Sequence, residues 1–195
     1  MRKIVATFAL ALMTVLSTDR ALAAPKETAR EETLLLFGQR RVTLTVPAGF
    51  IYSSGKNERG LITTQLTDST ETIMLQISFL PDDNGEFASS RGRKEFMVET
   101  FQPYVAGSVE RAMQFEELEP RSGGGTYCVF TDAKLVGKTN FPPGEFLNST
   151  TGVKSWRGCI AVFTLMSNNT TSEEYRTAIR LLRESLNEPP LTPLR

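Results

Sequence analysis

The absence of histidine limits the catalytic mechanisms and metal sites that the chain can form. The chain has 195 residues and no histidine. Ser-His-Asp and Cys-His catalysis, imidazole metal sites and histidine proton transfer are therefore excluded. Hydrolase mechanisms that use a carboxylate or a serine–lysine pair need no histidine and remain possible.

The acidic cluster Glu116, Glu117 and Glu119 does not look catalytic. In a strand, Glu117 and Glu119 share one face and Glu116 points to the other. Nothing marks a buried acid with a raised pKa. We predict no catalytic residue, and a hydrolase using a carboxylate or a Ser-Lys pair stays as the alternative.

Two segments resemble ligand-binding motifs only in part. Gly137-Lys138-Thr139 looks like the end of a P-loop, but Asp132 stands where the first glycine belongs, and Pro142-Pro143 cannot open the helix that must follow. The loop Asp82-Asp83-Asn84-Gly85 lacks the spacing of a calcium-binding loop. We expect neither a cofactor nor a metal.

Two surface features are candidates for binding. The loop from Lys138 to Glu145 carries Phe141 between a basic residue and a proline pair, as an exposed aromatic on a stiffened loop would. Alternatively, Phe141 is tucked under its own loop. Arg91, Arg93 and Lys94 crowd an expected helix start and form a possible basic patch, or an ordinary solvated face.

The amino terminus has the order of a signal peptide. Arg2 and Lys3 precede an apolar run from Ile4 to Leu16, and Ala21-Leu22-Ala23 supplies small residues for cleavage. We expect a signal peptide at 1–23, a flexible arm at 24–32, a single domain at 33–187 and a proline-rich tail at 188–195. The alternatives to the signal are an uncleaved anchor and a core helix. The expected location is periplasmic or secreted, with no stable membrane insertion after cleavage.

Cys128 and Cys159 are the only cysteines, and both lie in apolar, strand-like runs. An oxidising compartment favours a disulfide between them. It would close a loop of about 31 residues and contribute roughly 3–4 kcal/mol. Two separate buried thiols are the alternative.

The hydrophobic pattern predicts an α+β domain. Alternation predicts strands near 42–46 and 73–79. Further strands are expected near 34–37, 61–66, 112–118, 126–133 and 146–151, and an almost continuously apolar run predicts a central strand at 156–166. A helix should be capped by Ser89 or Ser90 and kink or end early at Pro103. A second helix should begin at the capping box of Thr171 and Glu174. We expect a mostly antiparallel sheet with helices packed against it.

The segment Arg41-Val42-Thr43-Leu44-Thr45-Val46-Pro47-Ala48-Gly49-Phe50 resembles the opening strand and turn of Mog1/PsbP-like domains. The order of elements over most of 33–187 is also similar to that family. The resemblance implies a Mog1/PsbP-like sandwich and a small accessory protein that binds partners or assists assembly.

These features together predict an exported, non-catalytic binding or assembly protein of the cell envelope. Its partner would be an unknown protein or small ligand. The 22 basic residues balance the 22 acidic ones, so nucleic acid binding is not expected. A structural subunit of an envelope complex is a further alternative, which a large exposed apolar patch would support.

Overall fold

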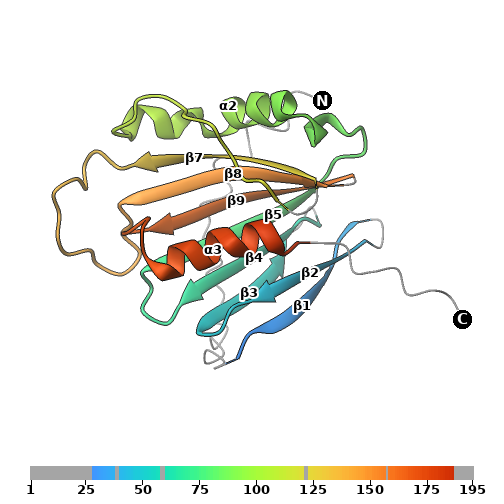
Figure 1. The fold of residues 1–195 in the computed structure, drawn as a ribbon, viewed down its shortest axis with the longest axis horizontal. Coiled ribbons are helices and arrows are strands. Elements are labelled where there is room, and N and C mark those ends of the chain that lie inside the picture. Colours follow the sequence, from blue (N-terminus) through green and yellow to red (C-terminus); the bar gives the residue numbers. More distant parts are fainter. Residues whose placement is uncertain (1–27, 38–39, 58–59, 121–122, 157, 187–195) are drawn as a thin grey trace, which may run out of the picture.

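The protein is a seven-stranded antiparallel sheet with a helix on each face and an extra two-stranded hairpin (Figure 1). The computed structural model describes residues 28–37, 40–57, 60–120, 123–156 and 158–186. The strands of the large sheet lie in the order β3-β4-β5-β9-β8-β7-β6, and β1 pairs with β2. The strands are β1 Arg30–Leu35, β2 Arg41–Val46, β3 Phe50–Lys56, β4 Ile62–Asp68, β5 Ile73–Pro81, β6 Glu116–Glu117, β7 Gly124–Thr131, β8 Asn148–Trp156 and β9 Cys159–Ser167. The helices are η2 Glu86–Ala88, α2 Ser90–Gly107 and α3 Glu173–Glu184. The predicted α+β class is confirmed.

The centre of the sheet is the β8–β9 hairpin, which is covered on both sides. Trp156 pairs with Cys159 at its turn, and Asn148 pairs with Ser167 at its open end. Successive side chains of a strand point to opposite faces. Cys159 and Phe163 therefore enter the core on one face, and Ile160 enters the core on the other.

One core lies between the sheet, α3 and the β1–β2 hairpin. Tyr175, Ala178, Leu181 and Leu182 of α3 are buried there, together with Leu44 of β2. The α3 N-cap is Ser172, whose hydroxyl accepts a hydrogen bond from the Tyr175 amide at 3.1 Å. The capping signal thus identified the helix, but the cap lies one residue after Thr171.

The second core lies under α2, which runs along β7 (Figure 1). Met97 and Phe101 of α2 pack there against Cys128 and Phe130 of β7. Of the two predicted caps, Ser89 is the N-cap, and its hydroxyl accepts a hydrogen bond from the Gly92 amide. Pro103 does not end the helix, which continues to Gly107.

Several predicted boundaries are wrong. Residues 30–32 of the expected arm belong to β1, where Arg30 pairs with Val46. The strand expected at 112–118 is reduced to Glu116–Glu117. The sequence pattern missed β3 altogether. The run that predicted one strand at 156–166 contains the turn between β8 and β9.

The predicted signal peptide and proline-rich tail lie outside the described residues. Within the described part of the chain, no helix is long and apolar enough to cross a membrane.

The predicted Cys128–Cys159 disulfide is absent from the structure, and both cysteines are buried thiols. They lie in different cores on opposite faces of the sheet. Cys128 pairs with Thr151, whereas Cys159 pairs with Trp156. That offset along β8 is about 16 Å at ~3.3 Å per residue. A disulfide needs Cα atoms within about 7 Å, so this fold cannot form it.

Thiol labelling tests this correction. The unfolded, non-reduced protein should take up two labels from an alkylating reagent. The folded protein should take up none quickly, because both side chains are fully buried and burial raises the pKa of the Cys128 thiol to about 12. An unfolded, non-reduced protein that takes up no label would instead show a disulfide.

The α3 packing can be tested by truncation. Leu182 is fully buried in the core beneath α3. Leu182→Ala should lower the free energy of unfolding by about 2–5 kcal/mol, because it leaves a cavity. Arg180→Ala, on the exposed side of the same helix, is the matched control and should change it by less than about 0.5 kcal/mol. Equal effects in urea unfolding would contradict the packing.

Candidate functional site

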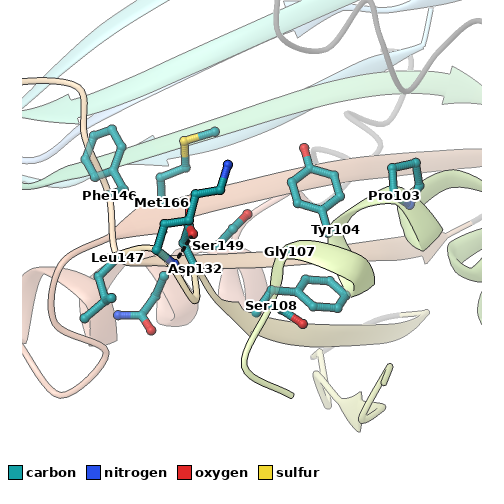
Figure 2. A pocket seen from close by; sticks show the side chains of 12 residues that line it. Pro103, Tyr104, Gly107, Ser108, Asp132, Phe146, Leu147, Ser149 and Met166 are labelled. Atoms are coloured by element: carbon teal, nitrogen blue, oxygen red, sulfur yellow. Dashed lines mark hydrogen bonds between the residues drawn. The ribbon is translucent and has the colours of Figure 1, made fainter. Parts of the chain in front are cut away.

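A pocket of about 300 Å³ opens where α2 ends above the sheet. It is bounded by the last turns of α2, by the loop between β7 and β8, and by β7, β8 and β9. Figure 2 shows Tyr104 and Pro103 on one side and Phe146 and Met166 on the other. The lining residues are Pro103, Tyr104, Gly107, Ser108, Phe130, Asp132, Lys134, Phe146, Leu147, Asn148, Ser149 and Met166.

The strand register builds one part of this lining. Ser149 of β8 pairs with Phe130 of β7 on one side and with Met166 of β9 on the other. These three residues form a row across the sheet, and directly paired residues share a face. Tyr104 of α2 stacks on Phe130, with ring centroids 5.9 Å apart and an interplanar angle of 22°. The pocket therefore has an aromatic wall held by both the helix and the sheet.

The end of α2 and the loop between β7 and β8 form the rim. Asp132 donates its amide hydrogen to the Leu147 carbonyl, which ties the two ends of the loop together. The Asn168 side chain accepts a hydrogen bond from the Leu147 amide at 2.7 Å and donates one to the Glu145 carbonyl at 3.1 Å. The loop is thus fixed to the end of β9.

The predicted binding loop contributes to this pocket through other residues. Lys138 and Glu145 form an ion pair at 3.0 Å across the loop, and Phe141 is half-buried. None of these three lines the pocket, whereas Phe146 and Leu147 do.

The three residues of the predicted basic patch do not form one exposed basic surface. Arg93 is only 4% exposed, and it donates hydrogen bonds to Thr126 and to the Ala88 carbonyl at 3.0 and 2.9 Å. Lys94 pairs with Glu117, and Arg91 pairs with Glu95. The Arg93 side chain therefore links the segment before α2 to β7, and it is not available to an acidic partner.

Some polar side chains of the pocket have hydrogen-bond partners, and the Ser149 hydroxyl does not. Ser108 donates to the Val105 carbonyl, and Asn148 accepts from Thr131. The Ser149 hydroxyl oxygen is shielded from solvent and has no hydrogen-bond partner among the described residues. Leaving such a group unpaired costs about 1–3 kcal/mol. Burial raises the pKa of Tyr104, which keeps its hydroxyl protonated.

The buried groups do not assemble a catalytic pair. Lys154 is 0% exposed, and its Nζ donates to the main-chain carbonyl of Ser185 at 2.5 Å. The Ser185 hydroxyl instead accepts a hydrogen bond from the Thr45 amide. Both residues are buried, so a substrate has no path to them. This pair gives the serine–lysine alternative no support.

The glutamates beside α2 are not poised as acids either. Burial acts to raise the pKa of Glu117, but Ser90, Arg93 and Lys94 outweigh it, so the pKa lies below the ordinary value. Glu116 accepts a hydrogen bond from the Tyr127 hydroxyl.

The buried Lys154 predicts a pH dependence of stability. Burial lowers the pKa of this amine to about 8, against about 10.4 in an unfolded chain. Below pH 8 both states hold the proton, and the folded state bears the cost of the buried charge. Between about pH 8 and 10 the unfolded state holds more protons, so stability increases with pH.

Urea unfolding of the wild type and of Lys154→Met at several pH values measures this effect. The wild type should gain about 2–3 kcal/mol relative to the variant between pH 8 and 10. The comparison cancels the tyrosines and Cys128, which titrate in both proteins. Parallel pH profiles would show that Lys154 does not titrate there.

Within the described residues, no three metal-ligating side chains gather around one point. Asp82, from the rejected calcium motif, accepts hydrogen bonds from the Glu86 and Phe87 amides and so caps η2.

No protein-family model matches the chain. A search of the curated proteins also finds no match. The Mog1/PsbP-like resemblance therefore stays a prediction.

Sequence reasoning missed most of the pocket residues. Tyr104 was assigned to the apolar stripe of α2, and Met166 to a central strand. One signal was present in the sequence: Pro103 lacks the amide hydrogen that would continue the main-chain hydrogen bonds, and it lies near the end of α2. Ser149 gives no such signal, because only the register places it beside Phe130 and Met166.

Proposed function

We propose that the protein is an exported, non-catalytic binding protein that holds a small, mainly apolar ligand in the pocket at the end of α2. The observation that carries this proposal is the pocket itself, about 300 Å³ with walls of Tyr104, Phe130, Phe146 and Met166. Small-molecule sites are concave and mostly apolar, with few polar groups. The proposed location rests on the signal-like segment at residues 1–23.

The enzymatic alternative receives no support from the groups that could carry it. Lys154 is fully buried, and the Ser90 hydroxyl together with Arg93 and Lys94 holds the pKa of Glu117 below its ordinary value. The pocket has Asp132 and Lys134 at its rim, and both side chains are exposed.

The exposed apolar residues give little support to the alternative of a structural envelope subunit. The exposed large apolar side chains of the described residues are Leu35, Val98, Val109 and Val136. They come from four different segments, and single exposed apolar residues are common on soluble proteins.

Filling the pocket tests the proposal. The mature protein, recovered from the exported fraction and checked by mass for cleavage after Ala23, is titrated with the uncharged fluorescent probe N-phenyl-1-naphthylamine. Met166→Trp should weaken binding of this probe at least about 10-fold, because the larger ring occupies the pocket.

Met74→Trp is the matched control. Met74 of β5 pairs directly with Met166 of β9, so the two residues lie on the same face of the sheet. Met74 does not line the pocket. This variant should bind the probe like the wild type. Equal binding by Met166→Trp and the wild type, with both folded by near-ultraviolet circular dichroism, would overturn the proposal.

A further inference from the structure

The pocket at the end of α2 continues into a row of uncharged side chains on the sheet. We infer that the ligand is longer than the pocket and carries an unbranched hydrocarbon chain, which leaves the pocket at Met166 and lies along this row. The inference rests on the proposed function, and it specifies the ligand class of the same site.

Cross-strand pairing defines the row. Met166 of β9, which lines the pocket, pairs with Met74 of β5. Met74 pairs with Thr67 of β4, and Thr67 pairs with Ile51 of the edge strand β3. Directly paired residues share a face, so these four side chains form one strip across the sheet. The strip spans roughly 14 Å at about 4.8 Å between neighbouring strands.

The strip is accessible beyond the pocket. All four of its side chains are half-buried. The helix α2 packs on β7 and β8, at the other end of the sheet from β3 and β4 (Figure 1). Among the described residues, the core under α2 includes no side chain of β3 or β4. The helix therefore stands over the pocket and not over the far end of the strip.

No charged side chain lies on this face of β3, β4 and β5. The alternation along the three strands places only uncharged residues there: Ile51, Ser53, Gly55, Thr63, Gln65, Thr67, Met74, Gln76, Ser78 and Leu80. A charged chain would lose water on this face without gaining a counter-ion. An uncharged chain loses little and covers apolar surface.

The strip is narrow, which favours one extended chain over a wide ring system. Gln76, Gln65 and Ser53 form the next row, two residues further along each strand and so about 7 Å away. The Gln65 amide donates a hydrogen bond to the Thr67 hydroxyl at 3.5 Å, which leaves the Thr67 methyl group for apolar contact. The two methionines can adapt to the shape of a chain, because their side chains are unbranched and flexible.

The test compares two uncharged chains, 1-octanol and 1-tetradecanol, by displacement of N-phenyl-1-naphthylamine from the mature protein. A fully buried methylene group tightens binding about 4-fold, so each of the six added methylene groups should contribute about 2-fold on a strip that buries it only in part. Thr67→Lys places a charge in the strip and should remove at least about 10-fold of the preference for 1-tetradecanol. Binding of 1-octanol, which fits inside the pocket, should not change.

Thr63→Lys is the matched control. It introduces the same charge on the same face of β4, but about 13 Å from the strip at ~3.3 Å per residue. This variant should keep the wild-type preference. A second measurement needs no variant: in the wild type, bound 1-tetradecanol should give nuclear Overhauser effects to the methyl groups of both Met166 and Met74.

Four results would overturn the elongated ligand while the proposed function stands. They are equal binding or no binding of the two alcohols by the wild type, an unchanged preference in Thr67→Lys, an equal loss in Thr63→Lys, and contacts of 1-tetradecanol to Met166 alone. If neither alcohol displaces the probe and Met166→Trp also binds the probe like the wild type, the proposed function itself fails.

Discussion

The two-residue alternation of β8 and β9 is the constraint on which the rest of the structure depends. These strands lie at the centre of the large sheet and are covered on both faces, so each residue serves one core or the other. A shift of one residue in their pairing would exchange the two sets of side chains. It would place Lys154 beneath α2 and would move Ser149 away from the pocket.

The pocket follows from an incomplete fit between α2 and this sheet. Met97 and Phe101 fill the space under the middle of the helix. Beyond them, Pro103 cannot donate a main-chain hydrogen bond, and the helix ends at Gly107, a residue without a side chain. The loop between β7 and β8 closes the far side, held by Asn168. The opening is therefore framed by hydrogen-bonded elements, which favours a site formed before the ligand arrives.

The sequence predicted those elements whose patterns are local. The alternation of β5 and the amphipathic face of α3 each report burial on a single side, and both were found. The strand β3 was missed because Ser53, Ser54 and Gly55 interrupt its apolar pattern. The β8–β9 turn was missed because strands buried on both faces show no period, so the apolar run hid the boundary at Gly158.

The disulfide was predicted wrongly, and the pocket was not predicted at all, for a related reason. Whether Cys128 and Cys159 meet depends on the face that each occupies and on the offset of their strands, and neither quantity is contained in the local sequence. The same is true of Ser149, Met166 and Tyr104, which become neighbours only through pairing and helix packing. The prediction for Arg93 was wrong because its charge indicated an exposed basic patch. The lack of a side chain at Gly124 instead lets the Arg93 guanidinium lie buried against β7.

The most direct test of a binding site at this place is to see which side chains a bound probe touches. The mature protein, labelled with ¹³C at its methionine methyl groups, is saturated with N-phenyl-1-naphthylamine, and contacts between the probe and the methyl groups are measured by intermolecular nuclear Overhauser effects. The account predicts contacts from the naphthyl ring of the probe to the Met166 methyl group and none to Met74, its cross-strand neighbour outside the pocket. Contacts to Met74 without contacts to Met166 would place the ligand elsewhere on the sheet and would contradict the account.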